Sequence, residues 1–453
     1  MKNNFEIKIH KAAFPNLSIG DLHGQDILLK GGLIGQKVRV KITRRKPGKL
    51  DGKILETLEA SPLETEPGCP RADDCGGCRY QKLTYDHELS YKLETLRNLY
   101  ADFDIDKNLL YLNESPIIEG YRNKMEYTFG DEFKDGPLVL GLHKRNRFYE
   151  IVDNFGCNIV PSDFESIRQE SMFFFENENI AHYHKKTRQG ALKFLIVRYA
   201  FATKEIMLNL VTKTDESISE ELLQDYIALV TNLNLDGKVV SVFHTISDSL
   251  ADAVVPDTIT KLYGQDYITE KMNGLTFRIS PFSFFQPNPI GAEKLFEAAL
   301  AYAGDLEDKL VYDLYCGTGT ISQIFAQKAR KVIGVEIVEE AVEKAKENAK
   351  LNGLDNCHFI ANDVLDEIAN LSEKPDVLVL DPPRDGIHPK AIDPIISMGA
   401  ETVVYISCNP RTQARDLHIF VSAGYKIEKL EFFDQFPRTA GAETVALLTR
   451  SSK

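Results

Sequence analysis

One cysteine lies at a position where a thiol could do chemistry. Cys408 occurs in the run VYISCNP at 404–410, where apolar β-branched residues give way to an Asn-Pro pair. This run predicts a buried strand that ends next to the cysteine and is followed by a turn. Ligands of open α/β sheets bind at the carboxyl ends of the strands, so a thiol there could act as a nucleophile. The plain alternative is a buried packing residue, because free cysteine is among the most buried residue types.

A segment upstream has the features of a nucleoside site. Residues 309–315 predict a strand, and the CGTGT segment at 316–320 predicts a glycine-rich turn that opens a helix. Glycine lets the backbone approach a ligand closely. The next predicted strand ends in Glu336, whose carboxylate could accept both hydroxyls of a ribose. A lone G-x-G turn is weak evidence and an exposed acid is the plain alternative, but the two together favour ribose binding.

The residues around this turn favour S-adenosylmethionine over a dinucleotide. A dinucleotide site prefers the fuller G-x-G-x-x-G pattern with a pyrophosphate at the helix N-terminus. Asp313, just before the glycines, disfavours a phosphate and suits a cationic ligand such as a sulfonium. Asp363 follows a third predicted strand, where it could meet the adenine edge or equally cap the next helix.

A fourth predicted strand ends in the Asp-Pro-Pro-Arg segment at 381–384. The two prolines predict a rigid turn over the methyl group of the cofactor. In methyltransferases that act on amines, the comparable turn usually continues to an aromatic residue that stacks on the target base. Arg384 stands there instead, so the target must be activated in another way.

Three further cysteines, Cys69, Cys75 and Cys78, follow the spacing C-x5-C-x2-C with two glycines between the last pair. A total of 7 cysteines without a secretory signal indicates metal binding or catalysis rather than disulfides. Zinc or a cubane cluster takes four ligands, and Cys157 is the candidate for the fourth. The spacing leaves zinc and iron–sulfur both open, and the lack of a C-x3-C-x2-C run argues against radical chemistry.

Basic clusters interrupt an acidic chain. The net charge of −13 by itself argues against a polyanionic partner. Residues 37–53 nevertheless carry eight Lys or Arg against one Asp, and three more basic clusters, each close to Tyr or Phe, occur at 120–124, 143–147 and 184–188. Solvated loops are the plain alternative for each cluster. Together they favour a phosphate-contacting surface with aromatic rings available for base stacking.

The pattern along the 453 residues predicts three domains. Short alternating segments at 1–60 predict a small OB-like barrel, a fold that commonly holds oligonucleotides. Strand-like segments from about 115 to 270 predict a mostly antiparallel sheet within a central domain at 61–270, and alternating strands and helices at 271–453 predict a doubly wound parallel sheet. No run is long and apolar enough for a membrane span and no secretory signal is present, so we expect a cytoplasmic protein.

Taken together, these segments resemble the RNA uracil-C5 methyltransferase family, in particular its bacterial 23S rRNA members, which carry an N-terminal TRAM barrel and a [4Fe-4S] cluster. The resemblance covers nearly the whole chain. It rests on the four cysteines and on the segments SFFQPN at 283–288, DLYCG at 313–317, DPPR at 381–384, SCNP at 407–410 and ETV at 443–445.

The resemblance implies an α/β fold with a Rossmann-like, S-adenosylmethionine-dependent methyltransferase domain, an OB-like TRAM barrel and a central iron–sulfur and RNA-binding domain. It implies that the [4Fe-4S] cluster is held by Cys69, Cys75, Cys78 and Cys157. The residues implied to contact S-adenosylmethionine are Gln286, Tyr315, Glu336 and Asp381, with Thr320 at a position where the family often has Asn.

The implied chemistry explains the need for a thiol. Uracil C5 is a poor carbon nucleophile, but addition of the Cys408 thiolate to C6 makes C5 enolate-like. A base must later remove the C5 proton, and the resemblance gives this role to Glu443, which would otherwise be taken for a surface glutamate.

The expected substrate is one or more uridines of 23S rRNA, flipped out or already in a loop. The alternatives are a tRNA uracil-C5 methyltransferase and an iron–sulfur RNA-binding protein with an inactive methyltransferase fold. No membrane and no obligate protein partner are expected.

Overall fold

The computed structural model describes residues 4–106 and 110–450, which divide into two compact units. Of the described residues, unit 1 contains 4–68, 78–106, 110–115 and 368–450, and unit 2 contains 69–77 and 116–367. Each unit therefore combines segments that are far apart in the sequence. The three-domain division expected from the sequence stays a prediction. Among the described residues, none of the helices has the length and apolar character needed to cross a membrane.

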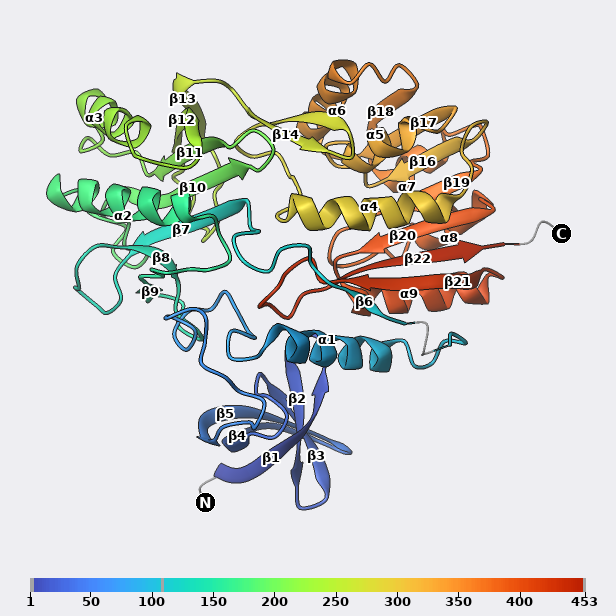
Figure 1. The fold of residues 1–453 in the computed structure, drawn as a ribbon, viewed down its shortest axis with the longest axis horizontal. Coiled ribbons are helices and arrows are strands. Elements are labelled where there is room, and N and C mark those ends of the chain that lie inside the picture. The colour runs from blue at the N-terminus through green and yellow to red at the C-terminus, as the bar shows by residue number, and fades with distance from the viewer. Residues whose placement is uncertain (1–3, 107–109, 451–453) are drawn as a thin grey trace. The chain divides into compact units, whose positions relative to one another are not determined.

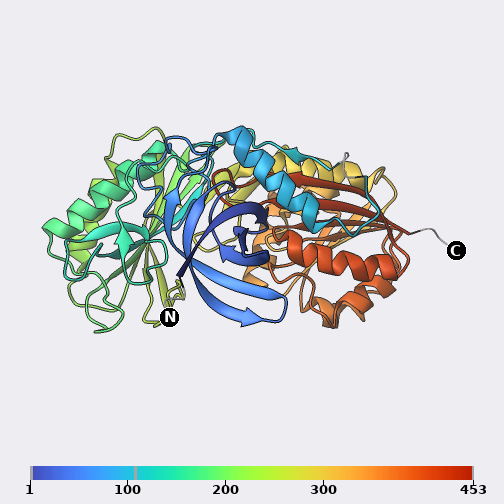
Figure 2. The same cartoon turned by 90° about the horizontal axis from the view of Figure 1, so that it is seen from below.

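The N-terminal part of unit 1 is a closed five-stranded barrel with the strand order β1-β2-β3-β5-β4. Alternate side chains such as Ile7, Ile27 and Val38 fill its core, because successive residues of a strand point to opposite faces. Figure 2 shows the barrel in dark blue. The expectation of an N-terminal barrel is confirmed. Its strands are β1 (Asn4–Ala13), β2 (Leu17–Leu22), β3 (Gln25–Lys30), β4 (Lys37–Lys46) and β5 (Lys49–Glu59).

The rest of unit 1 is an α/β layer in which the strand order is β19-β20-β22-β21-β6. Strands β19 and β20 are parallel, whereas β22 runs antiparallel between β20 and β21. The elements are α1 (Tyr85–Leu99), β6 (Leu112–Asn113), β19 (Val377–Leu380), α8 (Ile392–Ser397), β20 (Thr402–Ser407), α9 (Pro410–Ser422), β21 (Lys426–Phe433) and β22 (Glu443–Thr449).

Unit 2 begins with a seven-stranded sheet of order β13-β12-β11-β10-β7-β8-β9. All its pairs are antiparallel except β11–β12, which confirms the expectation of a mostly antiparallel central sheet. Helices α2 and α3 pack against each other and on the sheet (Figure 1). The elements are β7 (Lys124–Gly130), β8 (Val139–His143), β9 (Ile151–Val152), α2 (Ser162–Asn177), β10 (Leu192–Ala200), β11 (Glu205–Thr212), α3 (Glu220–Thr231), β12 (Lys238–Ile246) and β13 (Thr258–Gly264).

The remainder of unit 2 alternates helices with parallel strands in the order β18-β17-β16, preceded by an antiparallel hairpin of β14 and β15. This is the α/β pattern expected for the C-terminal half. Parallel strands bring their carboxyl ends to one edge, where a ligand can bind. The elements are β14 (Ile268–Met272), β15 (Leu275–Ile279), α4 (Pro289–Ala303), β16 (Leu310–Leu314), α5 (Thr320–Ala326), β17 (Lys331–Glu336), α6 (Glu339–Leu351), β18 (Cys357–Ala361) and α7 (Val364–Ile368).

Candidate active site

Strand register in unit 1 brings Cys408 and Glu443 to the same end of one ladder. In the antiparallel pair of β20 and β22, Ser407 lies opposite Thr444. Cys408 directly follows β20 and Glu443 is the first residue of β22, so the two residues face each other at the next position along the ladder. Glu443 is buried, with 5% of its surface exposed, and Cys408 is half-buried.

The Asp-Pro-Pro-Arg turn lies against the same strand end. Strand β19 runs parallel to β20, with Leu380 opposite Tyr405, so Asp381 follows at the carboxyl edge. The turn is tied to the residues after Cys408, because Asn409 Nδ2 donates a hydrogen bond of 2.7 Å to the backbone oxygen of Arg384. Unit 1 therefore brings together the thiol, Glu443, Asp381 and Arg384.

The electrostatics of this cluster shift the pKa values of Cys408 and Glu443. Burial, followed by the carboxylates of Glu443 and Asp381, raises the pKa of Cys408 to about 11, while the positive charge of Arg384, and then a hydrogen bond from it, act to lower this pKa. Burial and then Asp381 raise the pKa of Glu443 to about 8, again opposed by Arg384. A carboxylate whose pKa lies near neutrality is suited to general-base catalysis.

In unit 2, the glycine-rich turn after β16 adopts backbone conformations that favour glycine. Gly317 and Gly319 have φ angles of 54° and 74°, and Tyr315, which is not a glycine, has a φ of 70°. A Cβ atom at Gly319 would lie 2.6 Å from the ring of Phe359. The turn thus depends on glycine for both its conformation and its packing, and it leads into α5 at Thr320.

Glu336 at the end of β17 is held in place by the same turn. Its Oε2 accepts a hydrogen bond of 3.1 Å from the backbone N–H of Gly317, and its Oε1 accepts one of 3.0 Å from Val338. A carboxylate has about four acceptor positions, so it can still accept bonds from a ligand. The next residue, Ile337, is an apolar side chain that is 64% exposed beside this carboxylate.

Asp313 is a fully buried carboxyl group with an unused acceptor. Its Oδ2 accepts a hydrogen bond of 2.5 Å from Ser322 Oγ, whereas its buried Oδ1 has no partner within the part of the chain that the structure describes. Burial raises the pKa of Asp313 to about 7. An unpaired buried polar atom is costly unless a ligand pairs with it, which fits the expectation that this carboxylate faces a cation.

The segment that contains Gln286 is fastened to the same turn. Thr318 Oγ1 donates a hydrogen bond of 3.2 Å to the backbone oxygen of Phe284. The backbone oxygen of Gln286 accepts one of 3.1 Å from Asn123 Nδ2, and its side chain is half-buried.

Asp363 acts as a helix cap in the structure. Its side chain is exposed, and Oδ1 accepts a hydrogen bond of 2.8 Å from the backbone N–H of Leu365 at the start of α7. This is the capping alternative weighed from the sequence. Contact with an adenine stays a prediction.

Two residues to which the sequence reasoning gave no role are Arg384, which acts to lower the pKa of both Cys408 and Glu443, and the exposed Ile337. The signal for Arg384 was present, since it replaces an aromatic residue at the end of the Asp-Pro-Pro turn. Ile337 is an apolar residue that directly follows Glu336, and its position becomes informative only when its 64% exposure is known.

The cysteines Cys69, Cys75 and Cys157 lie close enough in unit 2 to influence one another. Burial raises the pKa of all three, and in Cys157, where it reaches about 11, the neighbouring thiols contribute to the rise. The backbone N–H of Gly77 donates to Cys75 Sγ at 3.4 Å. Within 4–106 and 110–450, no three His, Cys, Asp or Glu side chains are spaced to hold a single metal ion. Cys78 is half-buried and begins the segment of unit 1 that leads to α1.

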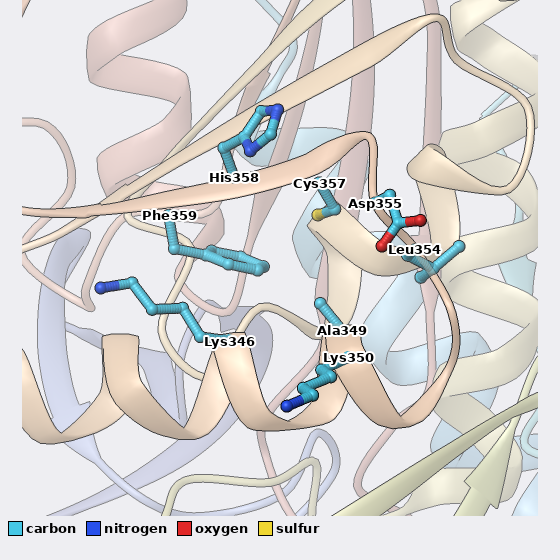
Figure 3. Close-up of a pocket in the computed structure, with 8 residues that line it drawn as sticks. All are labelled: Lys346, Ala349, Lys350, Leu354, Asp355, Cys357, His358 and Phe359. Carbon is cyan, nitrogen blue, oxygen red and sulfur yellow. The ribbon is translucent and has the colours of Figure 1, made fainter.

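A surface pocket lies between α6 and β18 (Figure 3). Figure 3 shows Lys346 and Ala349 on α6 next to Phe359 and Cys357 of β18. Cys357 is the first residue of β18, so part of the pocket lies at the amino end of this strand. The candidate cofactor residues lie at the carboxyl ends, and none of them lines this pocket. The pocket is therefore distinct from the candidate site.

Comparisons with known proteins agree with this geometry. Residues 84–451 match the family model described as tRNA (Uracil-5-)-methyltransferase. An uncharacterized RNA methyltransferase of Caldanaerobacter subterraneus is 43% identical, over 98% of each chain. Another from Clostridium acetobutylicum is 42% identical, over 98% of this chain and 97% of the relative.

Among solved structures, this chain resembles the Pyrococcus abyssi tRNA (uracil-54, C5)-methyltransferase, determined in complex with S-adenosyl-L-homocysteine. The TM-score is 0.76 and the identity is 25%, with 98% of this chain and 99% of that chain covered. The likeness supports a Rossmann-like methyltransferase fold joined to the N-terminal barrel. The chain belongs to the tRNA (uracil-5-)-methyltransferase family of S-adenosylmethionine-dependent RNA-modifying enzymes.

Proposed function

We propose that the protein methylates C5 of a specific uridine, or of more than one, in 23S rRNA. The observation that carries the proposal is the ladder register that sets Glu443 opposite Cys408, next to Asp381. Methylation of an exocyclic amine needs no thiol at this position. Alkylation of uracil C5 needs both a thiol and a base, and the pair has both.

In the proposed reaction, the Cys408 sulfur adds to C6 of the uracil and the new C–S bond raises the electron density at C5. S-adenosylmethionine supplies the electrophilic methyl group. Glu443 then takes the proton from C5, the C5–C6 double bond re-forms and the thiolate leaves. Arg384, which lowers the pKa of the thiol, is proposed to favour the thiolate that begins the sequence.

We propose that S-adenosylmethionine binds at the carboxyl ends of the strands. Glu336 accepts the ribose hydroxyls, Ile337 offers an apolar surface to the adenine, and Asp313 faces the cationic end of the molecule. The unpaired Oδ1 of Asp313 and the exposure of Ile337 support these roles. The other proposed contacts are Gln286, Tyr315, Thr320, Asp363 and Asp381.

We also propose that a [4Fe-4S] cluster is held by Cys69, Cys75, Cys78 and Cys157. Cys69 is buried, Cys75 and Cys157 are half-buried, and the three thiols lie close enough to influence one another; Cys75 also accepts a backbone N–H, which fits a cluster site. A single zinc ion needs its sulfur ligands about 2.3 Å from one point, whereas a cubane holds thiolates further apart. The cluster would join the 69–78 loop to the segment at Cys157, and no step of methyl transfer uses it.

The barrel of β1–β5 is proposed to be a TRAM-like module that holds RNA. The proposed domains are the barrel at 1–60, a central domain at 61–270 and a methyltransferase domain at 271–453.

A second candidate substrate is tRNA, because the solved archaeal relative is a tRNA (uracil-54, C5)-methyltransferase. The test is incubation with tritiated-methyl S-adenosylmethionine and unmodified transcripts of 23S rRNA and of tRNA, followed by nucleoside analysis. We expect labelled 5-methyluridine in 23S rRNA. Label only in tRNA would select the second candidate, and label in neither RNA would favour an RNA-binding protein without this activity.

The same assay tests the nucleophile. Cys408→Ala should abolish labelling while S-adenosylmethionine binding, measured by calorimetry, is retained. Cys357→Ala is the matched control, because Cys357 is a buried cysteine at the amino end of β18. Undiminished turnover by Cys408→Ala would contradict the mechanism.

A further inference from the structure

Two of the three basic clusters seen in the sequence form one surface in unit 2. The loop between β8 and β9 carries Phe148 and Tyr149, and the segment before β10 carries Lys185 and Lys186. The Lys185 Nζ lies 4.4 Å from the centre of the Phe148 ring, and the Lys186 Nζ lies 4.5 Å from the centre of the Tyr149 ring. We call these four residues the aromatic–basic surface.

The carboxylate of Asp252 links the two segments to each other. Asp252 accepts from His143 Nε2 at 3.1 Å and from Lys185 Nζ at 2.6 Å. The ring of His143 also stacks on Phe148, with centroids 5.7 Å apart. The ion pairs of Asp252 and the stacking of His143 on Phe148 therefore hold the two segments together at this surface.

The aromatic rings of this surface are open to solvent. Phe148 and Tyr149 are 55% and 56% exposed. Arg147 and Arg188, on the same two segments, are also exposed. Burial of each ring against a partner would be favourable.

The third basic cluster, at 120–124, does not form an exposed surface of this kind. Burial lowers the pKa of Lys124, which pairs with Glu126 at 2.5 Å, and Arg122 Nε donates to the backbone oxygen of Lys124 at 3.1 Å. Arg122 and Lys124 are both half-buried, whereas Arg147, Lys186 and Arg188 of the other two clusters are exposed, so Arg122 and Lys124 serve the local structure of β7. Of the three basic clusters that were expected to contact phosphate, those at 143–147 and 184–188 therefore remain candidates.

We propose that the aromatic–basic surface binds a single-stranded segment of RNA. This inference rests on the proposed function, which makes RNA the substrate. Bases stack on Phe148 and Tyr149, and the ammonium groups of Lys185 and Lys186 neutralise phosphates of the same segment. Rings and cations side by side are what single-stranded RNA requires, because each nucleotide offers one flat base and one charge. A double helix would hide the base faces.

The loop of unit 2 that carries Cys75 is hydrogen-bonded to the segment that leads to the aromatic–basic surface. The guanidinium of Arg145 donates to the backbone oxygens of Ala72 and Cys75 at 2.8 and 3.1 Å. The backbone N–H of Gly76 donates to the oxygen of His143 at 3.1 Å. The loop that carries Cys75 thus holds the segment that leads to Phe148, so the order of that loop affects RNA binding.

The test measures the affinity of the full-length Cys408→Ala protein for a fluorescein-labelled oligouridine of about 16 nucleotides by fluorescence anisotropy. Adding Phe148→Ala and Tyr149→Ala together should weaken binding roughly tenfold or more. Adding Lys185→Gln and Lys186→Gln should reduce the slope of log affinity against log salt by about 0.7 for each lost phosphate contact.

Matched controls come from the same unit. Phe173 on α2 is 48% exposed, and Lys204 pairs with Asp236 at 3.1 Å much as Lys185 pairs with Asp252. Phe173→Ala and Lys204→Gln should leave affinity and salt slope unchanged, and all variants should bind S-adenosylmethionine as before.

Unchanged RNA affinity in both surface variants would overturn the inference. The aromatic–basic surface would then be assigned to an acidic protein partner. Methyl transfer by the protein with Cys408 intact tests the proposed function separately, so either idea can fail alone.

Discussion

The Lys92 Nζ lies 2.7 Å from the Asp434 Oδ1, although the two residues are 342 positions apart in the chain. The same ammonium group lies 2.7 Å from Glu88 Oε1, and all three side chains are buried. Glu88 in turn accepts a 2.7 Å hydrogen bond from the backbone N–H of Arg438. Helix α1 thereby fixes the loop that leads from β21 to Glu443.

Removing the ammonium group should cost much of the stability of unit 1. Lys92→Met removes the cation that two buried carboxylates share and leaves Glu88 with the Arg438 guanidinium at 3.5 Å, so we expect the free energy of unfolding to fall by about 3–5 kcal/mol. Urea denaturation followed by circular dichroism measures the loss. Lys344→Met is the control, because its exposed pair with Glu347 is worth about 1 kcal/mol or less. Equal losses in the two variants would contradict the role of the buried pair.

The Cys408 thiol should respond in opposite directions to its two neighbours. Arg384→Gln removes the cation that lowers the pKa of the thiol, so the pKa should rise above about 11. Glu443→Gln removes a carboxylate that raises the pKa, so the pKa should fall. The rate of alkylation of the Cys408 peptide, followed by mass spectrometry against pH, reports both shifts. Arg411→Gln, an exposed arginine of the next turn, should leave the profile unchanged.

Loss of the base should stop the reaction after the thiol has added. Glu443→Gln keeps the size of the side chain but removes its ability to take the C5 proton, so a covalent protein–RNA adduct should accumulate. Denaturing gel electrophoresis with labelled RNA detects it. The double variant Glu443→Gln with Cys408→Ala should give no adduct. Full turnover by Glu443→Gln would assign the base to another residue.

Asp313 should make S-adenosylmethionine binding depend on pH. The carboxyl has a pKa of about 7, so it is ionised above that pH and should then hold the cationic ligand more tightly. Affinity measured by calorimetry should rise between about pH 6 and about pH 8, and Asp313→Asn should remove the rise. Ser322→Ala removes a hydrogen bond that lowers this pKa, so the midpoint should move to higher pH. A flat profile in the unsubstituted protein would rule out this role for Asp313.

The barrel and the alternation of strands with helices could be predicted because they depend on local patterns. Apolar and charged side chains alternate along 37–42, and this pattern indicates a half-buried strand wherever the strand lies in the fold. The relation of Cys408 to Glu443 is different, because it depends on the antiparallel register of β20 and β22, and no local pattern specifies which strands become neighbours. The motif resemblance pointed to both residues but not to their geometry.

Like strand register, the burial of individual side chains could not be predicted from the pattern of residue types. Lys124 and Lys186 look alike as members of basic clusters, yet burial lowers the pKa of Lys124 whereas Lys186 is exposed over an aromatic ring. Asp363 likewise caps a helix, which depends on where α7 begins. Sequence reasoning therefore identified the chemically capable residues, and the structure separated those that serve the fold.

The position of β22 bears on the order of events during synthesis. This strand leaves the ribosome after β20 and β21, yet it lies between them. Until it emerges, β20 and β21 have no shared partner and Glu443 is not yet beside Cys408. Domains form as units as the chain emerges, so an unfinished chain would have its thiol without its base. If Cys408 and Glu443 act as proposed, the pair that methyl transfer needs is completed only when β22 has emerged.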